Sequence, residues 1–231
     1  MQVYLDIETI PSQNPAVLAK IKQEAENEIA QIKAPANYKD EAKIAEYVAA
    51  KADQIRAEID TVYRKTALDG AQGSICCIVV AFGNSEPVII SEVDESVILH
   101  HFYNVMISYC DPHNAQFVGH NIVNFDLRYI YQRSIIQGIK HYAGIPFHAK
   151  PWDDHRVFDT MTRWAGVGNR ISLSKLCDAL GVAGKGSELG EDMDGSKVWD
   201  LYKAKRYADI ATYCAGDVER VRAIYKKMNF L

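Results

Sequence analysis

QVYLDI, at residues 2–7, sets the first element of the fold. Apolar and more polar side chains alternate along it, and this period of two predicts a β-strand that starts almost at the first residue. Asp6 and Glu8 are two residues apart at the end of the strand, so their side chains project from one face. Neighbouring carboxylates are costly unless they share a cation or a proton, which makes this pair a candidate for catalysis. A surface pair at a strand end is the alternative.

A segment of different character runs from Asn14 to Lys65. Its apolar residues recur at helical spacing in two runs, and KAPANYKD at 33–40 separates these runs with a proline and an asparagine. The pattern predicts a long α-helical hairpin inserted after the first strand. The segment carries nine Lys/Arg and nine Asp/Glu, so tracking of phosphates is its least favoured role. Self-association, a clamp over substrate and a dock for a protein partner all stay open.

After Gly73 the sequence predicts strands again. Residues 74–82 (SICCIVVAF) are apolar almost throughout, which is typical of a central strand, and residues 87–92 pair with them across a short turn. Two more short strands are expected at 115–119 and 156–160.

Helices are expected between and after these strands. Asp94 and either Ser172 or Ser174 are suitable N-cap residues, and Gly181 is a suitable helix end. The expected helices cover residues 95–109, 122–137, 172–181 and 205–228. The fold class is therefore α/β, with a mixed sheet flanked by helices. Residues 1–13 and 66–231 are expected to form one domain, with 14–65 as the hairpin insertion.

Composition is that of an ordinary globular protein. Of the 231 residues 48% are apolar and 24% are charged, and no apolar run is long enough to span a membrane. The five cysteines form no CxxC pair, so we expect a reduced, cytoplasmic protein without a zinc site or a membrane partner. The net charge of −4 argues against a broad basic face for nucleic acid. Residues 126–175 and 197–227 each carry eight Lys/Arg against four acids, so the second half can still attract phosphate locally.

Two further patterns contain acidic residues that are candidates for chemistry. GHNIVNFDLRYI at 119–130 places Asp126 early in an expected helix, where an interaction with the helix dipole is the alternative role. Tyr213 and Asp217 lie one turn apart on one face of the last helix. The alternative for this pair is a tyrosine that happens to lie near an acid. Each pattern is a weak signal by itself.

The order of the patterns is more specific than any one of them. D-I-E-T lies on the first strand, N-x-x-x-F-D at 121–126 on a following helix, and Y-x-x-x-D at 213–217 on the last helix. This order resembles the DEDD (DnaQ-like) 3′–5′ exonucleases of the ribonuclease H-like fold, in the subclass with tyrosine in the third motif. The chain is most similar to stand-alone exonucleases related to the proofreading domain of family-B DNA polymerases. That group shares S-L-x-x-L (172–176), G-K-G (184–186) and D-G-S-x-V-W (194–199).

The resemblance covers about residues 2–10 and 74–228 and gives the hairpin no counterpart. It implies a ribonuclease H-like fold and hydrolysis of phosphodiester bonds at single-stranded 3′ ends, with DNA preferred. It also implies two Mg²⁺ or Mn²⁺ ions. Such hard cations prefer carboxylate oxygens and water, and the chain offers four acids in these motifs with no matching His/Cys cluster.

The family roles can be assigned residue by residue. Asp6 would bridge both ions, Glu8 and Asp217 would complete the site that activates water, and Asp126 would hold the second ion. Tyr213 would orient the attacking water and the scissile phosphate as a protonated phenol. Candidate contacts with the terminal nucleotide are Thr9, Asn121 and Phe125.

Neighbouring residues have plainer interpretations. Asp159 is expected to accept structural hydrogen bonds, and a role in local structure is favoured over a ligand role for His120 and Asn121. Four clustered acids should repel one another without metal, so Asp217→Ala is expected not to lower the stability of the metal-free protein.

Two alternative functions stay open. The first is the same chemistry on RNA, because recognition of the 2′-OH cannot be read from this sequence. The second is a non-catalytic nucleic-acid or protein-binding module that uses the hairpin. The presence of all five motif residues argues against this second function.

Overall fold

A computed structural model describes residues 1–111, 113–184 and 193–231. The chain divides into two compact units. One consists of Met1–Ile10 together with Ile75–Leu231, and the other of Pro11–Ser74. The second unit contains the whole of the expected insertion at 14–65.

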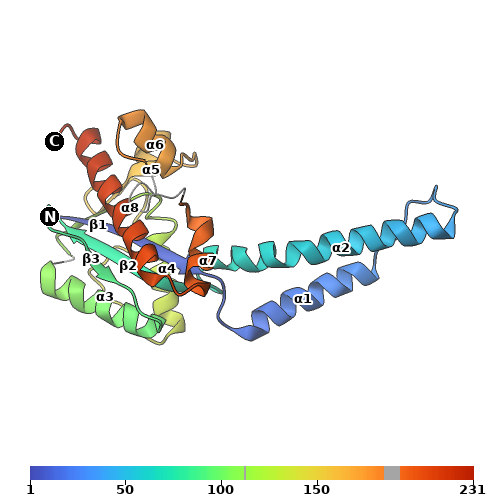
Figure 1. Cartoon of the computed structure of the whole chain (residues 1–231). Coiled ribbons are helices and arrows are strands. Elements are labelled where there is room, and N and C mark those ends of the chain that lie inside the picture. The colour runs from blue at the N-terminus through green and yellow to red at the C-terminus, as the bar shows by residue number, and fades with distance from the viewer. Residues whose placement is uncertain (112, 185–192) are drawn as a thin grey trace. The chain divides into compact units, whose positions relative to one another are not determined.

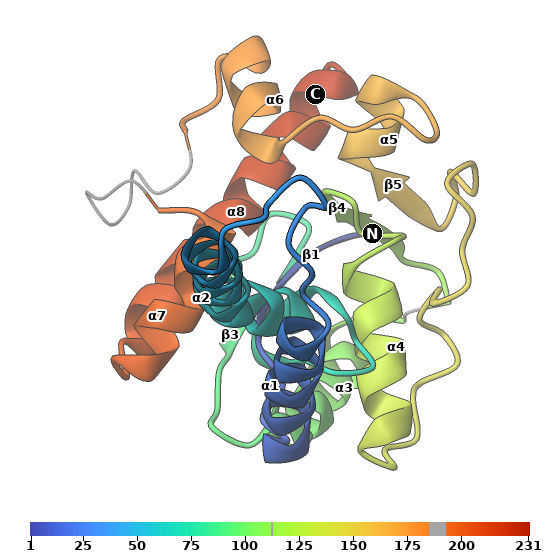
Figure 2. The same cartoon turned by 90° about the vertical axis from the view of Figure 1, so that its right-hand side faces the viewer.

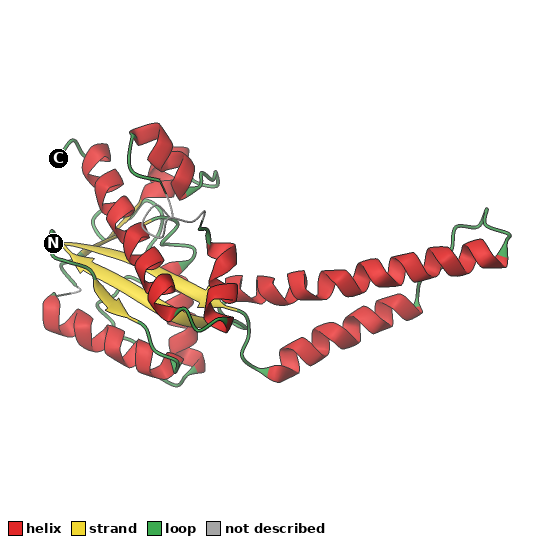
Figure 3. Cartoon of the chain, viewed as in Figure 1, coloured by secondary structure: helices red, strands yellow, loops and turns green. Residues whose placement is uncertain are grey.

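The first unit is built on a five-stranded sheet in the order β3-β2-β1-β4-β5. β1 runs parallel to β4, and β4 runs parallel to β5, whereas β2 and β3 are antiparallel. The sheet is therefore mixed, as predicted, and helices lie on both of its sides (Figure 3). β1 pairs with β4 only over Gln2–Tyr4, so its second half extends beyond the end of β4 and lies beside residues that follow that strand. The strands are β1 (Gln2–Ile10), β2 (Ser74–Phe82), β3 (Val88–Ile90), β4 (Gln116–Gly119) and β5 (Val157–Asp159).

Alternation along β1 decides which face each of its side chains joins. Val3, Leu5 and Ile7 pack into a core with α3 and α4, while Tyr4 packs into a second core with α6, α7 and α8. Figure 2 shows α8 and α4 on opposite sides of β1. Asp6 and Glu8 share the register of Tyr4 and therefore lie on the face that α8 covers. The helices of this unit are α3 (Glu95–Tyr109), α4 (Asp126–Ile136), α5 (Thr160–Ala165), α6 (Leu173–Leu180), α7 (Val198–Lys203) and α8 (Tyr207–Met228), with a 3₁₀ turn at Gly195–Lys197.

Local capping agrees with the sequence at most helix ends. The Asp94 side chain accepts from Ser96 N at 2.8 Å and starts α3, and Ser172 accepts from Lys175 N to start α6. Gly181 ends α6 with a φ of +61°, a conformation that suits glycine. Two short helices, α5 and α7, were not predicted. Lys185 and Gly186 of the G-K-G motif lie outside the described residues.

The predicted start of the helix at residue 122 was wrong. α4 begins at Asp126, and residues 121–125 form a turn that begins with Asn121 at a φ of +65°. Asparagine tolerates this left-handed conformation better than most residues. The correction moves Asp126 from inside a helix to its first position, where its side chain points back toward β1.

The second unit is the predicted helical hairpin. α1 (Pro15–Ala30) and α2 (Glu41–Lys65) lie side by side and antiparallel (Figure 1), followed by a 3₁₀ turn at Thr66–Leu68. Arg56 of α2 donates two hydrogen bonds to the Glu26 carboxylate of α1, at 3.1 and 3.2 Å. At the base, Ser12 N donates to Thr66 Oγ1, Thr66 Oγ1 donates to Tyr63 O, and Tyr63 Oη donates to Ser12 O. Across the described parts of the chain, no helix has both the length and the apolar character needed to cross a membrane.

Candidate active site

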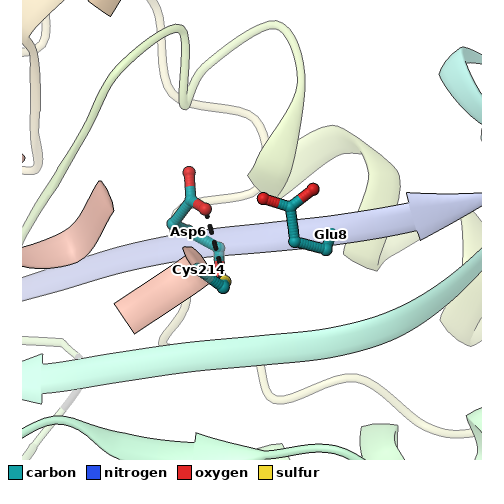
Figure 4. Close-up of side chains that lie close together, drawn as sticks. All are labelled: Asp6, Glu8 and Cys214. Atoms are coloured by element: carbon teal, nitrogen blue, oxygen red, sulfur yellow. Dashed lines mark hydrogen bonds between the residues drawn. The ribbon is translucent and has the colours of Figure 1, made fainter. Parts of the chain in front are cut away.

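The two carboxylates of β1 lie on one side of the strand, together with a thiol from α8 (Figure 4). Ligand atoms of Asp6, Glu8 and Cys214 all lie within 4.8 Å of one another. Glu8 is 8% exposed and Asp6 is half-buried, so the group lies at the edge of the α8 core rather than in open solvent. The separation of two residues along a strand, predicted from the sequence, brings these carboxylates together.

Cys214 is the member of this group that the sequence did not indicate. Its thiol donates to Asp6 Oδ2 at 3.3 Å and lies 3.5 Å from Asp6 O. Burial, then a hydrogen bond with the Cys77 thiol and the charges of Asp6 and Glu8, raises the pKa of Cys214 well above its usual range. A neutral thiol is therefore the favoured form beside the carboxylates. Cys214 lies three residues before Asp217, on the same helix face. This spacing is the one sequence feature that could have indicated its place in the site.

Asp126, at the start of α4, contacts the same strand. Its Oδ1 accepts a hydrogen bond of 3.1 Å from Ile7 N, the residue between Asp6 and Glu8. The side chain is 2% exposed. Burial, and then the neighbouring Asp6 carboxylate, raises the pKa of Asp126 well above its ordinary value. The first two motifs of the sequence thus meet through a direct hydrogen bond.

Asp159 organises the turn that leads to Asp126. Its carboxylate accepts four backbone N–H bonds: two come from the turn, at Asn121 and Val123, and two come from the start of α5. The side chain is buried, as expected for an acceptor of this kind. The structural role predicted for Asp159 is confirmed, and it consists of fixing the turn between β4 and α4.

His120 is also held by local structure. Its Nδ1 lies 3.0 Å from Thr160 Oγ1, and its Nε2 lies 2.9 Å from Ile171 O. These bonds connect the turn after β4 to α5 and to the segment before α6. The structural role expected for His120 therefore fits the geometry.

The third motif lies on α8, which packs against β1. Tyr213 is 1% exposed within the α8 core, and Asp217 follows one turn later at 3% exposure. Oδ1 of Asp217 accepts from Arg220 Nη1 at 3.1 Å, and this buried ion pair has an i, i+3 spacing that is readable in the sequence. Among the described residues, Asp126 and Asp217 lie outside the group that Asp6, Glu8 and Cys214 form within 4.8 Å.

The three candidate substrate contacts occupy different positions. Thr9 is largely buried near the end of β1. Asn121 donates its backbone N–H to Asp159, and its side chain is half-buried. Phe125 is half-buried immediately before Asp126, with its ring centroid 5.4 Å from that of Tyr129. Thr9 therefore follows Glu8 on β1, and Phe125 precedes Asp126 at the start of α4, so each lies next to a candidate metal ligand.

The donor set fits a hard divalent cation. Carboxylate oxygens are the ligands that Mg²⁺ and Mn²⁺ prefer, and Asp6, Glu8 and Asp126 supply them from β1 and the start of α4. Burial, and after it the Asp6 carboxylate, raises the pKa of Asp126, and a bound cation would favour the charged form of this carboxyl. The thiol of Cys214 is the one soft donor in this group.

Acidic side chains gathered beside the central strand of a mixed sheet can hold divalent cations of the kind that assist phosphodiester hydrolysis. Residues 73–231 match the family described as predicted 3′-5′ exonucleases related to the exonuclease domain of PolB. The match covers more than half of the chain, so the chain belongs to this family of nucleases, which are hydrolases. Asp6 and Glu8 precede the matched residues and join the others through the pairing of β1 in the sheet.

The fold is also found in solved structures. One is the family B DNA polymerase from the hyperthermophilic archaeon Pyrobaculum calidifontis, with a TM-score of 0.52 and 16% sequence identity. The similarity covers 70% of this chain and 22% of the polymerase chain. This chain thus corresponds to about a fifth of the polymerase. No curated protein matches the sequence.

Proposed function

We propose that this chain is a divalent-metal-dependent 3′–5′ exonuclease that removes nucleotides from single-stranded DNA ends by a two-metal-ion mechanism. The observation that carries the proposal is the meeting of Asp126 with β1 at Ile7, between Asp6 and Glu8. It occurs in a chain of a predicted 3′–5′ exonuclease family, and the acids come from the motifs that the resemblance identified.

The metal ions would be Mg²⁺ or Mn²⁺, held by Asp6, Glu8, Asp126 and Asp217. When bound, such ions neutralise charge on the attacking and leaving oxygens and lower the pKa of water. The chain itself contributes four carboxylates fixed by three elements: β1, the first position of α4, and α8. Asp159 keeps the turn before Asp126 in place, and Cys214 keeps α8 against Asp6.

Tyr213 and the turn residues would bind the substrate end. A tyrosine hydroxyl is a donor and an acceptor at neutral pH, so we assign Tyr213 to orienting the attacking water and the phosphate. Phe125 offers an aromatic face to a terminal base, since stacking on aromatic side chains is a common mode of single-strand binding. Thr9 and Asn121 would contact the terminal nucleotide.

The helical hairpin and the free cysteines bear on the partner and the location of the protein, respectively. The hairpin carries balanced charge, which favours a protein partner or a second copy of this chain over a nucleic-acid strand. Its deletion with a short linker, followed by measurements of mass in solution and of cleavage, separates these roles. All five cysteines are free thiols, and we propose a reducing, cytoplasmic location.

Cleavage of matched oligonucleotides tests the proposed activity. The substrates are a 5′-labelled single-stranded DNA, the same sequence as RNA, a duplex, and a DNA whose last 3′ linkage is a phosphorothioate. We expect a ladder that shortens from the 3′ end on single-stranded DNA with Mg²⁺ or Mn²⁺, and full loss of cleavage with EDTA. The phosphorothioate end should slow the first step.

Three outcomes would contradict parts of the proposal. Cleavage at full rate in EDTA removes the metal-dependent mechanism. Faster cleavage of RNA than of DNA reassigns the substrate while the chemistry stays. Internal cuts on a circular single strand would make the protein an endonuclease.

A further inference from the structure

Arg220 is buried between the third motif and the segment that follows α6. Its Nη1 donates to Asp217 Oδ1 at 3.1 Å, and the side chains of this pair are 5% and 4% exposed. Its Nη2 donates to Gly184 O at 2.7 Å, and its Nε donates to the same oxygen at 3.0 Å. The guanidinium is thus attached on two sides and cannot turn away from Asp217 without breaking bonds to the backbone.

Arg222, two residues later on α8, is a natural comparison. It also pairs with an acid three residues earlier, Glu219, and it also donates through Nη2 to a loop carbonyl, that of Ser85 at 2.7 Å. Arg222 is largely buried as well. The two arginines therefore make the same kind of structural contact, but only Arg220 makes it with an acid of the proposed metal site.

We infer that Arg220 is a positioning residue that holds the Asp217 carboxylate and, as a fixed positive charge beside it, weakens the binding of divalent cations at that ligand. The inference rests on the proposed function, because it takes Asp217 as a metal ligand. A carboxylate has about four lone-pair sites, so Asp217 can accept from Arg220 and still bind a cation. The cation then lies close to a guanidinium that the Gly184 carbonyl keeps in place.

The sign of the effect follows from Coulomb's law. A fixed unit positive charge repels a divalent ion close by, and this repulsion is strong where side chains are buried. Removal of the charge therefore tightens metal binding, although it also frees the Asp217 side chain to move. A purely structural arginine predicts the opposite sign, because a loosened ligand binds metal less well.

The test measures Mn²⁺ binding to the full chain without nucleic acid, by electron paramagnetic resonance, in Arg220→Gln, Arg220→Lys and Arg222→Gln. We expect at least about tenfold tighter binding of the weaker Mn²⁺ ion in Arg220→Gln. Binding no tighter than in the parent protein is expected for Arg220→Lys, which keeps the charge but not the fork of donors, and binding within about twofold for Arg222→Gln, which removes a charge elsewhere on α8. The kcat at saturating Mn²⁺ should fall in Arg220→Gln and stay near the parent value in Arg222→Gln.

The outcomes separate the inference from the proposed function. If the parent protein binds no Mn²⁺, the proposed function fails. If it binds and cleaves, but Arg220→Gln binds Mn²⁺ no tighter than Arg222→Gln, the inference is wrong and the function stands. Arg220→Met replaces the Gln variant if that variant does not fold. Folding of either neutral variant only upon addition of Mn²⁺ supports the inference, and failure to fold even with Mn²⁺ overturns it.

Discussion

The Cys214 thiol donates a hydrogen bond of 3.3 Å to Oδ2 of Asp6, a residue 208 positions earlier in the chain. This bond joins the last helix to the first strand at the centre of the sheet. It orients Oδ2 of Asp6, the oxygen from which the dashed line runs to Cys214 in Figure 4. The first and third motifs therefore depend on one another for their positions.

Asp6→Asn tests the carboxylate and Cys214→Ser tests its orientation. We expect Asp6→Asn to lower kcat by at least about a thousandfold, because loss of a metal-ligand charge removes several kcal/mol of stabilisation. Cys214→Ser retains a donor, so its kcat should stay within about tenfold of the parent value. Both rates are measured on 5′-labelled single-stranded DNA with Mn²⁺. An equal fall in kcat in the two variants would mean that the hydrogen bond between Cys214 and Asp6, and not the charge of Asp6, determines the rate.

Asp126→Asn should stabilise the metal-free protein at neutral pH. Burial and Asp6 raise the pKa of Asp126, so this group favours folding below its unfolded pKa of about 3.9 and loses that contribution as the pH rises through the folded pKa. The Asn variant keeps an oxygen for Ile7 N and removes the charge. We expect a Tm higher by at least about 2 °C at pH 7.5, and a difference that shrinks toward pH 4.

Thermal melts in EDTA across this pH range check the prediction. Asp94→Asn is a suitable control, because asparagine caps a helix as well as aspartate does and Asp94 is exposed at the start of α3. A gain of the same size in the control, or a gain in Asp126→Asn that does not change with pH, would contradict the electrostatic explanation.

The structure reverses the expected effect of Asp217→Ala on stability. The expectation from the sequence considered only repulsion among acids, whereas Arg220 pairs with Asp217 in a buried place. Loss of one partner from such a pair leaves the other charge uncompensated and costs about 3–5 kcal/mol. Urea unfolding of the metal-free variant should show this loss. Unchanged stability would mean that Arg220 finds another acceptor.

Asp159→Ala should unfold the turn before Asp126. The variant leaves three buried N–H groups and one part-buried N–H group without their acceptor, and each buried unsatisfied group costs about 1–3 kcal/mol, so a total loss of at least about 3 kcal/mol is expected. The cleavage activity should fall together with the stability, because the turn positions Asp126 at the start of α4. Hydrogen exchange of the Asn121 and Val123 amides locates the effect. Asp94→Ala, which loses a single exposed cap bond, should be much milder.

Local rules made the elements of the fold readable. The period of two at 2–7 predicted β1, the apolar run at 74–82 predicted a central strand, and the caps at Asp94 and Ser172 marked two helix starts that the structure confirms. The helical hairpin followed from two amphipathic runs around a proline. Each of these signals lies within a few residues of the element that it specifies.

Features that depend on distant contacts were missed. The start of α4 shifted from residue 122 to 126 because Asp159, on another strand, holds residues 121–123 in a turn. The role of Cys214 cannot be read from the sequence, because its partner Asp6 becomes a neighbour only when α8 packs on β1. The spacing of Arg220 from Asp217 is readable in the sequence. The hydrogen bond from Arg220 to the Gly184 carbonyl, 36 residues away, is not.

Ser12, Tyr63 and Thr66 close a ring of hydrogen bonds at the base of the hairpin, so the chain leaves the hairpin next to where it entered. An inserted segment whose first and last residues lie side by side can change in length without moving the strands that flank it in sequence. A change in the length of α1 and α2 is therefore expected to leave this ring, and the two ends of the hairpin that it joins, in place.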